Sequence, residues 1–182
     1  LLAKILCRSG IHQRKKQEIK RFLSPAKSLL SETQRLSSEV DLKTALIRLE
    51  KAIKNKESVI VHGDSDADGI TATTILVVGL RSLGLTVYHD FPIRSQEGHG
   101  VQIRIIEEAL NKKCSLMLTA DSGTKDVSAI AYAQEKGLDV IVTDHHLLGF
   151  EKPNACAIIN PLLYGKETPD CFLCGAGVAL KL

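Results

Sequence analysis

Three aspartates stand at alternate positions directly after a short apolar run of the sequence. They are Asp64, Asp66 and Asp68, and Gly69 follows them. Carboxylates this close repel one another unless a cation lies among them, and hard cations such as Mg²⁺, Mn²⁺ and Ca²⁺ prefer clustered oxygen ligands. The sequence therefore predicts a divalent-metal site at this point of the chain.

The same spacing occurs at the start of an EF-hand calcium loop, which has ligands at positions 1, 3 and 5 and glycine at position 6. An EF-hand also needs a bidentate glutamate at position 12, where this chain has Ile75. It further needs an entering helix, whereas Ser58–Val61 is short and β-branched, as in a buried strand. We therefore expect a strand–loop–helix unit rather than an EF-hand.

Strand and helix patterns alternate from residue 58 onward. Such alternation forms right-handed βαβ units and a parallel sheet. We therefore predict an α/β fold with a parallel five-stranded sheet and helices on both of its faces. The expected strands are 58–62, 86–91, 115–120, 138–143 and 155–159, and the expected helices are 69–83, 101–110, 125–136 and 175–182.

The chain before residue 58 has a different composition. Residues 1–57 show helical signals without strands, including an apolar stripe over 42–53 with Asp41 as its candidate N-cap. They carry 14 Lys and Arg against 6 Asp and Glu, whereas residues 58–182 carry 10 against 15. A basic segment beside an acidic, metal-binding domain suits a polyanionic substrate, although solvated helix faces would also explain it. We predict a small helical basic segment over 1–57 and a catalytic α/β domain over 58–182.

Two further strand ends carry acidic or histidine residues. Asp121-Ser122-Gly123 follows the expected third strand and Asp144-His145-His146 follows the fourth. Either segment alone could be a helix cap or surface decoration. Because the carboxyl ends of parallel strands meet at one edge of a sheet, we expect both segments to converge with the aspartates. Mixed carboxylate and imidazole ligands suit Mn²⁺ or Mg²⁺, and two such ions can activate water at a phosphoester.

Other features exclude several protein classes. No apolar run approaches the length of a membrane span, and no secretory signal pattern is present. Five cysteines at irregular spacing favour a reducing cytoplasm over a disulfide framework. Cys171 and Cys174 have the spacing of half a zinc site, but no second pair completes it.

Segments spread over residues 42–182 resemble the motifs of the DHH phosphoesterase superfamily, in the superfamily's order. The triple-aspartate segment and the Gly-Ala-Gly-Val-Ala segment are similar to those of its RecJ group, the 5′→3′ exonucleases specific for single strands. The resemblance implies a metal-dependent phosphodiesterase that acts on single-stranded DNA in repair and recombination, with a helicase or a single-strand-binding protein as a further partner. The segments that carry it are Asp64–Gly69, Pro92–Arg94, Glu97–Gly100, Asp121–Gly123, Thr143–His146, Asn160–Pro161 and Cys174–Val178.

The resemblance also implies roles for single residues. Arg94 would bind substrate phosphate, and His146 would contact the scissile phosphate or support the second ion. His62 is a further candidate ligand, because shorter superfamily members use a histidine at that distance before an aspartate. Asp144 would orient the loop or a ligand from outside the metal shell. The residues expected to hold the ions are Asp64, Asp66, Asp68, Asp121 as the bridge and His145, and the expected catalytic residues are Asp121, His145 and His146.

Some features depart from the RecJ pattern. Ser65 stands where the group usually has an aromatic residue, and His99 stands where it usually has tyrosine. The group also takes a metal-binding aspartate from downstream of segment 175–182 and clamps nucleic acid with a second subdomain. Because the chain starts at Leu1 without Met and stops at Leu182 inside a helical pattern, we expect a fragment with weak metal binding and little activity alone.

Two other functions remain open. One is a DHH phosphodiesterase that acts on short oligonucleotides or cyclic dinucleotides, although those relatives tend to lack the third aspartate. The other is a replication scaffold that has lost catalysis. A scaffold should have lost ligands, whereas every ligand expected over 58–182 is present.

Overall fold

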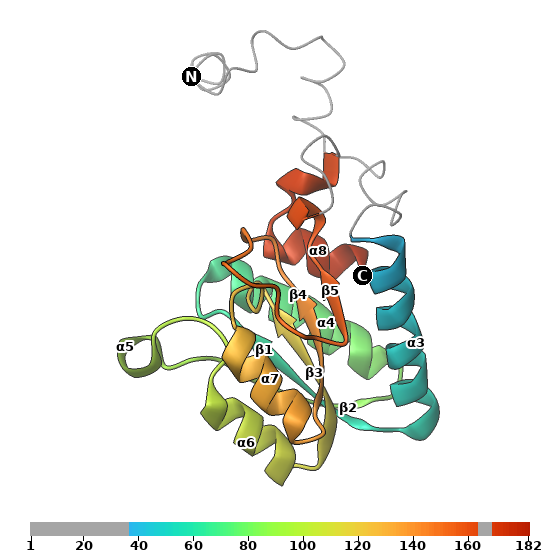
Figure 1. Cartoon of the computed structure of the whole chain (residues 1–182). Coiled ribbons are helices and arrows are strands. Elements are labelled where there is room, and N and C mark those ends of the chain that lie inside the picture. The colour runs from blue at the N-terminus through green and yellow to red at the C-terminus, as the bar shows by residue number, and fades with distance from the viewer. Residues whose placement is uncertain (1–36, 164–168) are drawn as a thin grey trace, which may run out of the picture. The chain divides into compact units, whose positions relative to one another are not determined.

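Five parallel strands form the centre of the structure, in the order β2-β1-β3-β4-β5 (Figure 1). This computed structural model describes residues 37–163 and 169–182. The predicted parallel five-stranded α/β sheet is confirmed, with strand ends within about two residues of those expected. The strands are β1 (Ser58–Gly63), β2 (Thr86–Asp90), β3 (Cys114–Ala120), β4 (Asp139–Thr143) and β5 (Ala157–Ile159).

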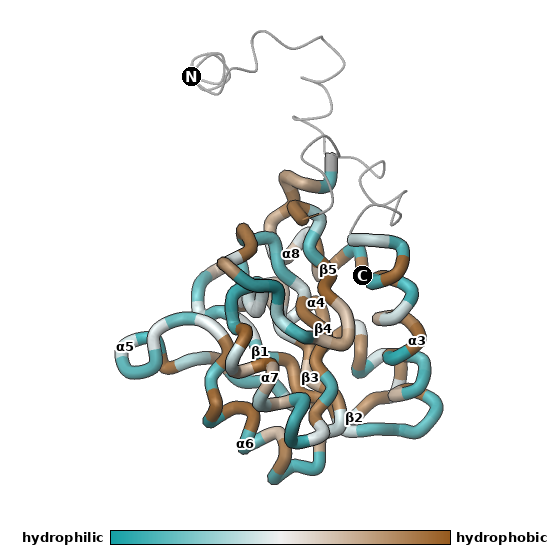
Figure 2. Tube along the Cα trace, in the orientation of Figure 1, coloured by the Kyte–Doolittle hydropathy of each residue, from teal (hydrophilic) through white to brown (hydrophobic). Residues whose placement is uncertain are grey.

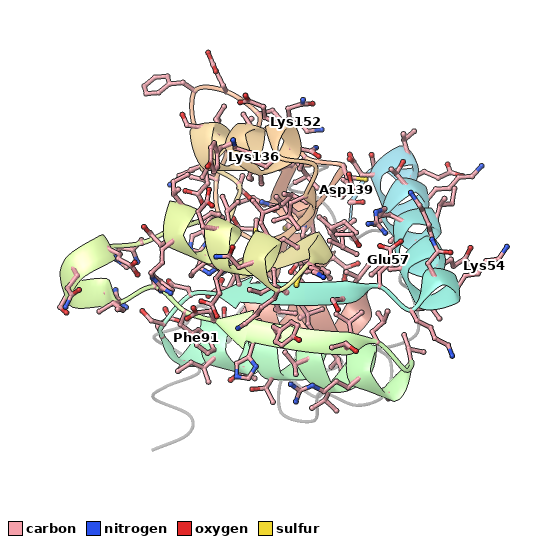
Figure 3. All side chains as sticks on the ribbon, turned by 90° about the horizontal axis from the view of Figure 1, so that it is seen from below. Lys54, Glu57, Phe91, Lys136, Asp139 and Lys152 are labelled. Atoms are coloured by element: carbon pink, nitrogen blue, oxygen red, sulfur yellow. The ribbon has the colours of Figure 1, made fainter. Side chains whose placement is uncertain are left out.

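Helices cover both faces of the sheet, as predicted. Figure 3 views the sheet from below and shows α6 and α7 on one side of the strands and α4 on the other. The short helix α5 was not predicted, because four residues are too few to show a helical period. The helices are α3 (Glu39–Asn55), α4 (Ala67–Ser82), α5 (Arg94–Glu97), α6 (Ile103–Asn111), α7 (Val127–Glu135) and α8 (Gly175–Lys181), with the 3₁₀ turns η3 (Pro161–Leu163) and η4 (Pro169–Phe172).

The strands are buried on both faces, so their side chains form two hydrophobic cores. Val59 and Val61 of β1 pack with α3, α4 and α8, whereas Ile60 packs with α6 and α7. This alternation follows from the two-residue period of a strand. Figure 2 accordingly shows hydrophobic colour along the central strands and hydrophilic colour on many of the turns.

Helix α3 begins one turn earlier than the sequence suggested. Ser38 is its N-cap and accepts the backbone N–H of Asp41 over 2.9 Å, so the expectation that Asp41 caps the helix is wrong. Asp41 instead accepts the Ser38 hydroxyl, an arrangement similar to a capping box. Ala45 and Ala52 are fully buried in the same core as the sheet. Residues 1–36 of the predicted basic segment lie outside the described residues.

Within the described ranges, no helix is both long enough and apolar enough to cross a lipid bilayer. The cysteines at 114, 156, 171 and 174 form no disulfide within those ranges.

Candidate metal centre

The predicted metal ligands lie at the carboxyl end of the sheet, where the strand order reverses. The chain leaves β1 for β2 on one side and then returns to the other side of β1 as β3. Ligands of open α/β sheets bind at such a switch point. Asp64, Asp121 and Asp144 each donate a backbone N–H to a carbonyl oxygen of the neighbouring strand, over 3.0–3.1 Å. The first acidic residue of each loop is therefore fixed by the sheet itself.

Side chains from the three loops come close enough to share metal ions. One group contains Asp64, Asp66 and Asp121, and a second contains Asp121, His145 and His146. The ligand atoms of each group lie within 4.8 Å of one another. Because Asp121 belongs to both groups, two cations held there would share its carboxylate.

Asp121 combines a buried carboxylate with a strained backbone conformation, and both are energetically unfavourable. Its side chain is only 2% exposed, and its φ of +61° lies in the left-handed region. His145 Nε2 lies 3.0 Å from Asp121 Oδ1 as an ion-pair contact, but this buried oxygen accepts no hydrogen bond from the described residues. Burial raises the pKa of the Asp121 carboxyl. A divalent cation would offset this desolvation, and the mixed oxygen and imidazole donors fit Mn²⁺ or Mg²⁺.

Asp144 orients the two histidines that follow it. Its buried Oδ1 accepts the backbone N–H of His145 over 2.7 Å and that of His146 over 3.1 Å, and it lies 2.7 Å from His146 Nδ1. Its Oδ2 accepts the Thr124 N–H over 2.9 Å. Burial alone would raise the pKa of Asp144, but the bonds from His146 and Thr124 outweigh it and lower that pKa to about 2. Asp144 is therefore ionised at neutral pH, and its hydrogen bond raises the pKa of His146.

Asp66 and Asp68, which follow Asp64 in the loop after β1, have additional structural roles. Asp66 is the N-cap of α4, and its Oδ1 accepts the N–H groups of Asp68 and Gly69 over 2.9 and 3.0 Å. Asp68 accepts N–H groups from the first turn of α8, and its Oδ2 lies 3.6 Å from His145 Nε2. Asp68 belongs to neither ligand group. It borders the centre on the α8 side.

His62 is not brought into the ligand groups. Its ring is fully buried, and its Nε2 lies 3.0 Å from the Gly100 carbonyl oxygen. Burial lowers the pKa of His62, so the ring is neutral at pH 7. It lies two residues after Ile60, so strand alternation directs it to the α6 side of the sheet. In this structure His62 supports the loop around Gly100.

Arg94 is connected to the centre through His99. It is exposed, and its Nη2 lies 3.3 Å from His99 Nε2. The other ring nitrogen of His99 lies 3.6 Å from Asp64 Oδ2. His99 therefore stands between the predicted phosphate-binding arginine and the first aspartate.

A cavity of about 270 Å³ opens beside the ligand groups. Lys125 and Asp126 line it and were missed by sequence reasoning, although both follow Asp121 in the same loop. That position after a strand end was the available signal, but a single lysine or aspartate there has no distinctive pattern. The lining residues are Asp64, His99, Gly100, Asp121, Ser122, Gly123, Lys125, Asp126, Asp144 and His146.

The N-terminal domain of the DHH family matches residues 58–182 of the chain. The chain belongs to the DHH family. It is also similar to RecJ, the single-stranded-DNA-specific exonuclease. RecJ of Haemophilus influenzae is 37% identical over 172 residues, which are 94% of this chain and 29% of that protein. RecJ of Thermus thermophilus is 41% identical over 143 residues, 78% of this chain and 21% of that protein.

Solved structures agree with this similarity. A crystal structure of exonuclease RecJ bound to manganese has a TM-score of 0.68 and 39% identity, over 76% of this chain and 35% of that one. RecJ of Thermus thermophilus in complex with Mn²⁺ has a TM-score of 0.63 and 35% identity, over 84% of this chain and 22% of that one. The chain thus spans less than a third of the full RecJ sequences of Haemophilus influenzae and Thermus thermophilus.

Proposed function

We propose that this chain provides the metal centre of a RecJ-like exonuclease that releases nucleotides from the 5′ end of single-stranded DNA. The observation that carries the proposal is the buried Asp121 carboxylate, which two ligand groups share at the switch point of the sheet. The RecJ relatives support the substrate, and the manganese-bound RecJ structures support Mn²⁺ as the cofactor, with Mg²⁺ as the alternative.

Different residues would bind each of the two ions at this centre. When bound, a pair of divalent ions supplies a nucleophilic water and neutralises charge on the phosphate. Asp64 and Asp66 would hold one ion, His145 would hold the other, and Asp121 would join both. A ligand role for Asp68 stays a prediction, beside its contact with α8.

The remaining side chains would position the substrate. His146 is fixed through its Nδ1 by Asp144, which leaves its Nε2 for a phosphate oxygen or the second ion. Arg94 would bind a neighbouring phosphate, because its planar guanidinium pairs with two oxygens at once. Ionised Asp144 would keep the His146 ring in one orientation while its Nε2 contacts the substrate phosphate.

Several finer features of the proposal depend on the likeness to RecJ alone. They are the 5′→3′ direction, a role in repair and recombination, a helicase or single-strand-binding partner, and action in the cytoplasm. Digestion of DNA with one labelled end tests the direction before any partner is sought.

The decisive experiment is Mn²⁺-dependent digestion of 5′-labelled single-stranded DNA by the full-length protein, beside Asp121→Ala. Short labelled products that the variant does not release would support the nuclease. Bound metal without cleavage of long DNA would favour short oligonucleotides or cyclic dinucleotides, which a series of substrate lengths distinguishes. Absence of both metal binding and cleavage would favour an inactive scaffold.

A further inference from the structure

Lys125 is a free cation on the wall of the metal centre. It lies in the loop between β3 and α7, and it lines the 270 Å³ cavity together with Asp121 and His146. Its side chain is exposed and has no hydrogen-bond or ion-pair partner among the described residues. A lysine ammonium beside a phosphodiester-cleaving centre is suited to bind a phosphate as a point charge.

A second cavity, of about 480 Å³, shares Lys125 with the first. Lys125 lines both cavities, and Gly149 and Phe150 of the loop after His146 line the second. The stem of Lys125 runs past Gly149, since a Cβ added to that glycine would lie 3.7 Å from Lys125 Cγ. Lys125 therefore borders both cavities and connects the metal centre with the loop of Gly149 and Phe150.

Phe150 is a large apolar side chain that lies in solvent. Its side chain is fully exposed, so it contributes nothing to either core. Exposed aromatic side chains beside cationic ones are the usual platform for single-stranded nucleic acid, because every base has a face that can stack on them. Glu151 also lines the second cavity, and its carboxylate would repel a phosphate there but not a base.

We propose that Lys125 and Phe150 form a nucleotide subsite, in which Lys125 binds a backbone phosphate next to the scissile one and Phe150 stacks on an unpaired base. The Lys125–Phe150 subsite rests on the proposed function, because the scissile phosphate defines its starting point. It gives the protein a reason to prefer single strands, since a base inside a duplex cannot offer its face to Phe150. The subsite is tolerant of base identity, because it reads a phosphate and a ring face.

The test is binding of fluorescent single-stranded DNA to the full-length protein in EDTA, which prevents cleavage. Phe150→Ala should weaken binding about 5- to 100-fold without changing its salt dependence. Lys125→Ala should weaken binding and reduce the slope of log K against log salt by about 0.7, the value for one phosphate contact on a single strand. Phe150→Tyr keeps the ring and should bind like the wild type.

Matched controls distinguish binding at the subsite from non-specific binding of DNA. Phe172 is also exposed but lines neither cavity, and Lys136 lies at the C-terminal end of α7, so Phe172→Ala and Lys136→Ala should leave binding unchanged. A 2-aminopurine base placed in the strand should be quenched by the wild type and by Phe150→Tyr, but not by Phe150→Ala.

The results distinguish the subsite from the proposed function. Mn²⁺-dependent cleavage by the wild type, with unchanged affinity and salt slope in Lys125→Ala and Phe150→Ala, would overturn the subsite and leave the nuclease intact. Equal losses in the Phe172 or Lys136 controls would overturn it as well. A wild type that neither binds nor cleaves single-stranded DNA would overturn both.

Discussion

Asp68 and Gly175 join the loop after β1 to the last helix, α8. Asp68 Oδ2 accepts the Gly175 N–H over 2.8 Å, and its Oδ1 accepts the next N–H, that of Ala176, over the same distance. Gly175 also packs on the third-strand loop, because a Cβ added to it would lie 2.6 Å from Asp121 Cβ and Oδ1. The start of α8 therefore forms one wall of the centre, although it lies far from both loops in sequence.

Gly175→Ala should damage metal binding through this contact. The added methyl group would push Asp121 out of both ligand groups, since the neighbouring atoms belong to a buried, constrained side chain. We expect Mn²⁺ affinity to fall at least about tenfold and stability to fall by about 1–3 kcal/mol, the usual cost of overpacking. Calorimetric titration with Mn²⁺ and urea unfolding measure the two effects.

Gly79→Ala is the matched control for this substitution. Gly79 lies inside α4, and an added Cβ meets no atom within 4 Å. The change should leave Mn²⁺ binding unaltered and raise stability by about 0.5–1 kcal/mol, because alanine favours a helix more than glycine does. Equal Mn²⁺ affinities in both variants would refute the role assigned to Gly175.

Asp144 gives a prediction for the dependence of stability on pH. Its pKa of about 2 in the folded protein lies below the ordinary value of 3.8, so its ionised form contributes stability above pH 4. That contribution, about 2 kcal/mol, is lost as the pH falls from about 4 to about 2. Asp144→Asn lacks it at every pH. The difference in unfolding free energy between the metal-free proteins should therefore shrink over this range, and a constant difference would contradict the assignment.

The sequence was sufficient for the parts of the site that depend on strand ends. Buried β-branched runs identify the strands, and parallel pairing then brings Asp64, Asp121 and Asp144 to one edge. It was insufficient where the contacts of a residue depend on the direction of its side chain. Strand alternation turns His62 towards the α6 side, and the local backbone makes Ser38 rather than Asp41 the cap of α3. Long-range contacts such as that between Asp68 and α8 leave no local pattern.

His99 should affect substrate binding more than catalysis, because it stands between Arg94 and Asp64. His99→Phe removes both ring nitrogens and lets the guanidinium move. We expect KM for single-stranded DNA to rise about 3- to 10-fold, as for a lost hydrogen bond, with kcat and Mn²⁺ affinity little changed. His99→Tyr keeps a polar atom on the ring and should recover part of the loss. A matching fall in Mn²⁺ affinity would mean that His99 acts on Asp64 instead.

Arg48 should anchor α3 to the sheet. It is nearly buried, and its guanidinium donates to Glu57 and Asp139, which lie beside α3 in Figure 3. Arg48→Ala should lower stability by about 2–4 kcal/mol in urea unfolding, because it leaves two carboxylates without their cation. Lys54→Ala, on the outer side of the same helix, should cost less than about 0.5 kcal/mol. Equal costs would show that the ion pairs of Arg48 do not hold α3 to the sheet.

The shared position of Asp121 predicts how metal stoichiometry responds to single substitutions. Asp64 belongs to one ligand group only, so Asp64→Asn should weaken one ion and leave the other bound. Asp121→Asn should weaken both ions together, because each group loses its common carboxylate. Electron paramagnetic resonance of Mn²⁺ measures the difference directly. The wild type should give the broadened spectrum of two neighbouring ions. Asp64→Asn should give the sharp spectrum of one bound ion, and Asp121→Asn should give mainly the spectrum of free Mn²⁺. A single bound ion in the Asp121 variant would show that this residue serves one site and does not bridge two.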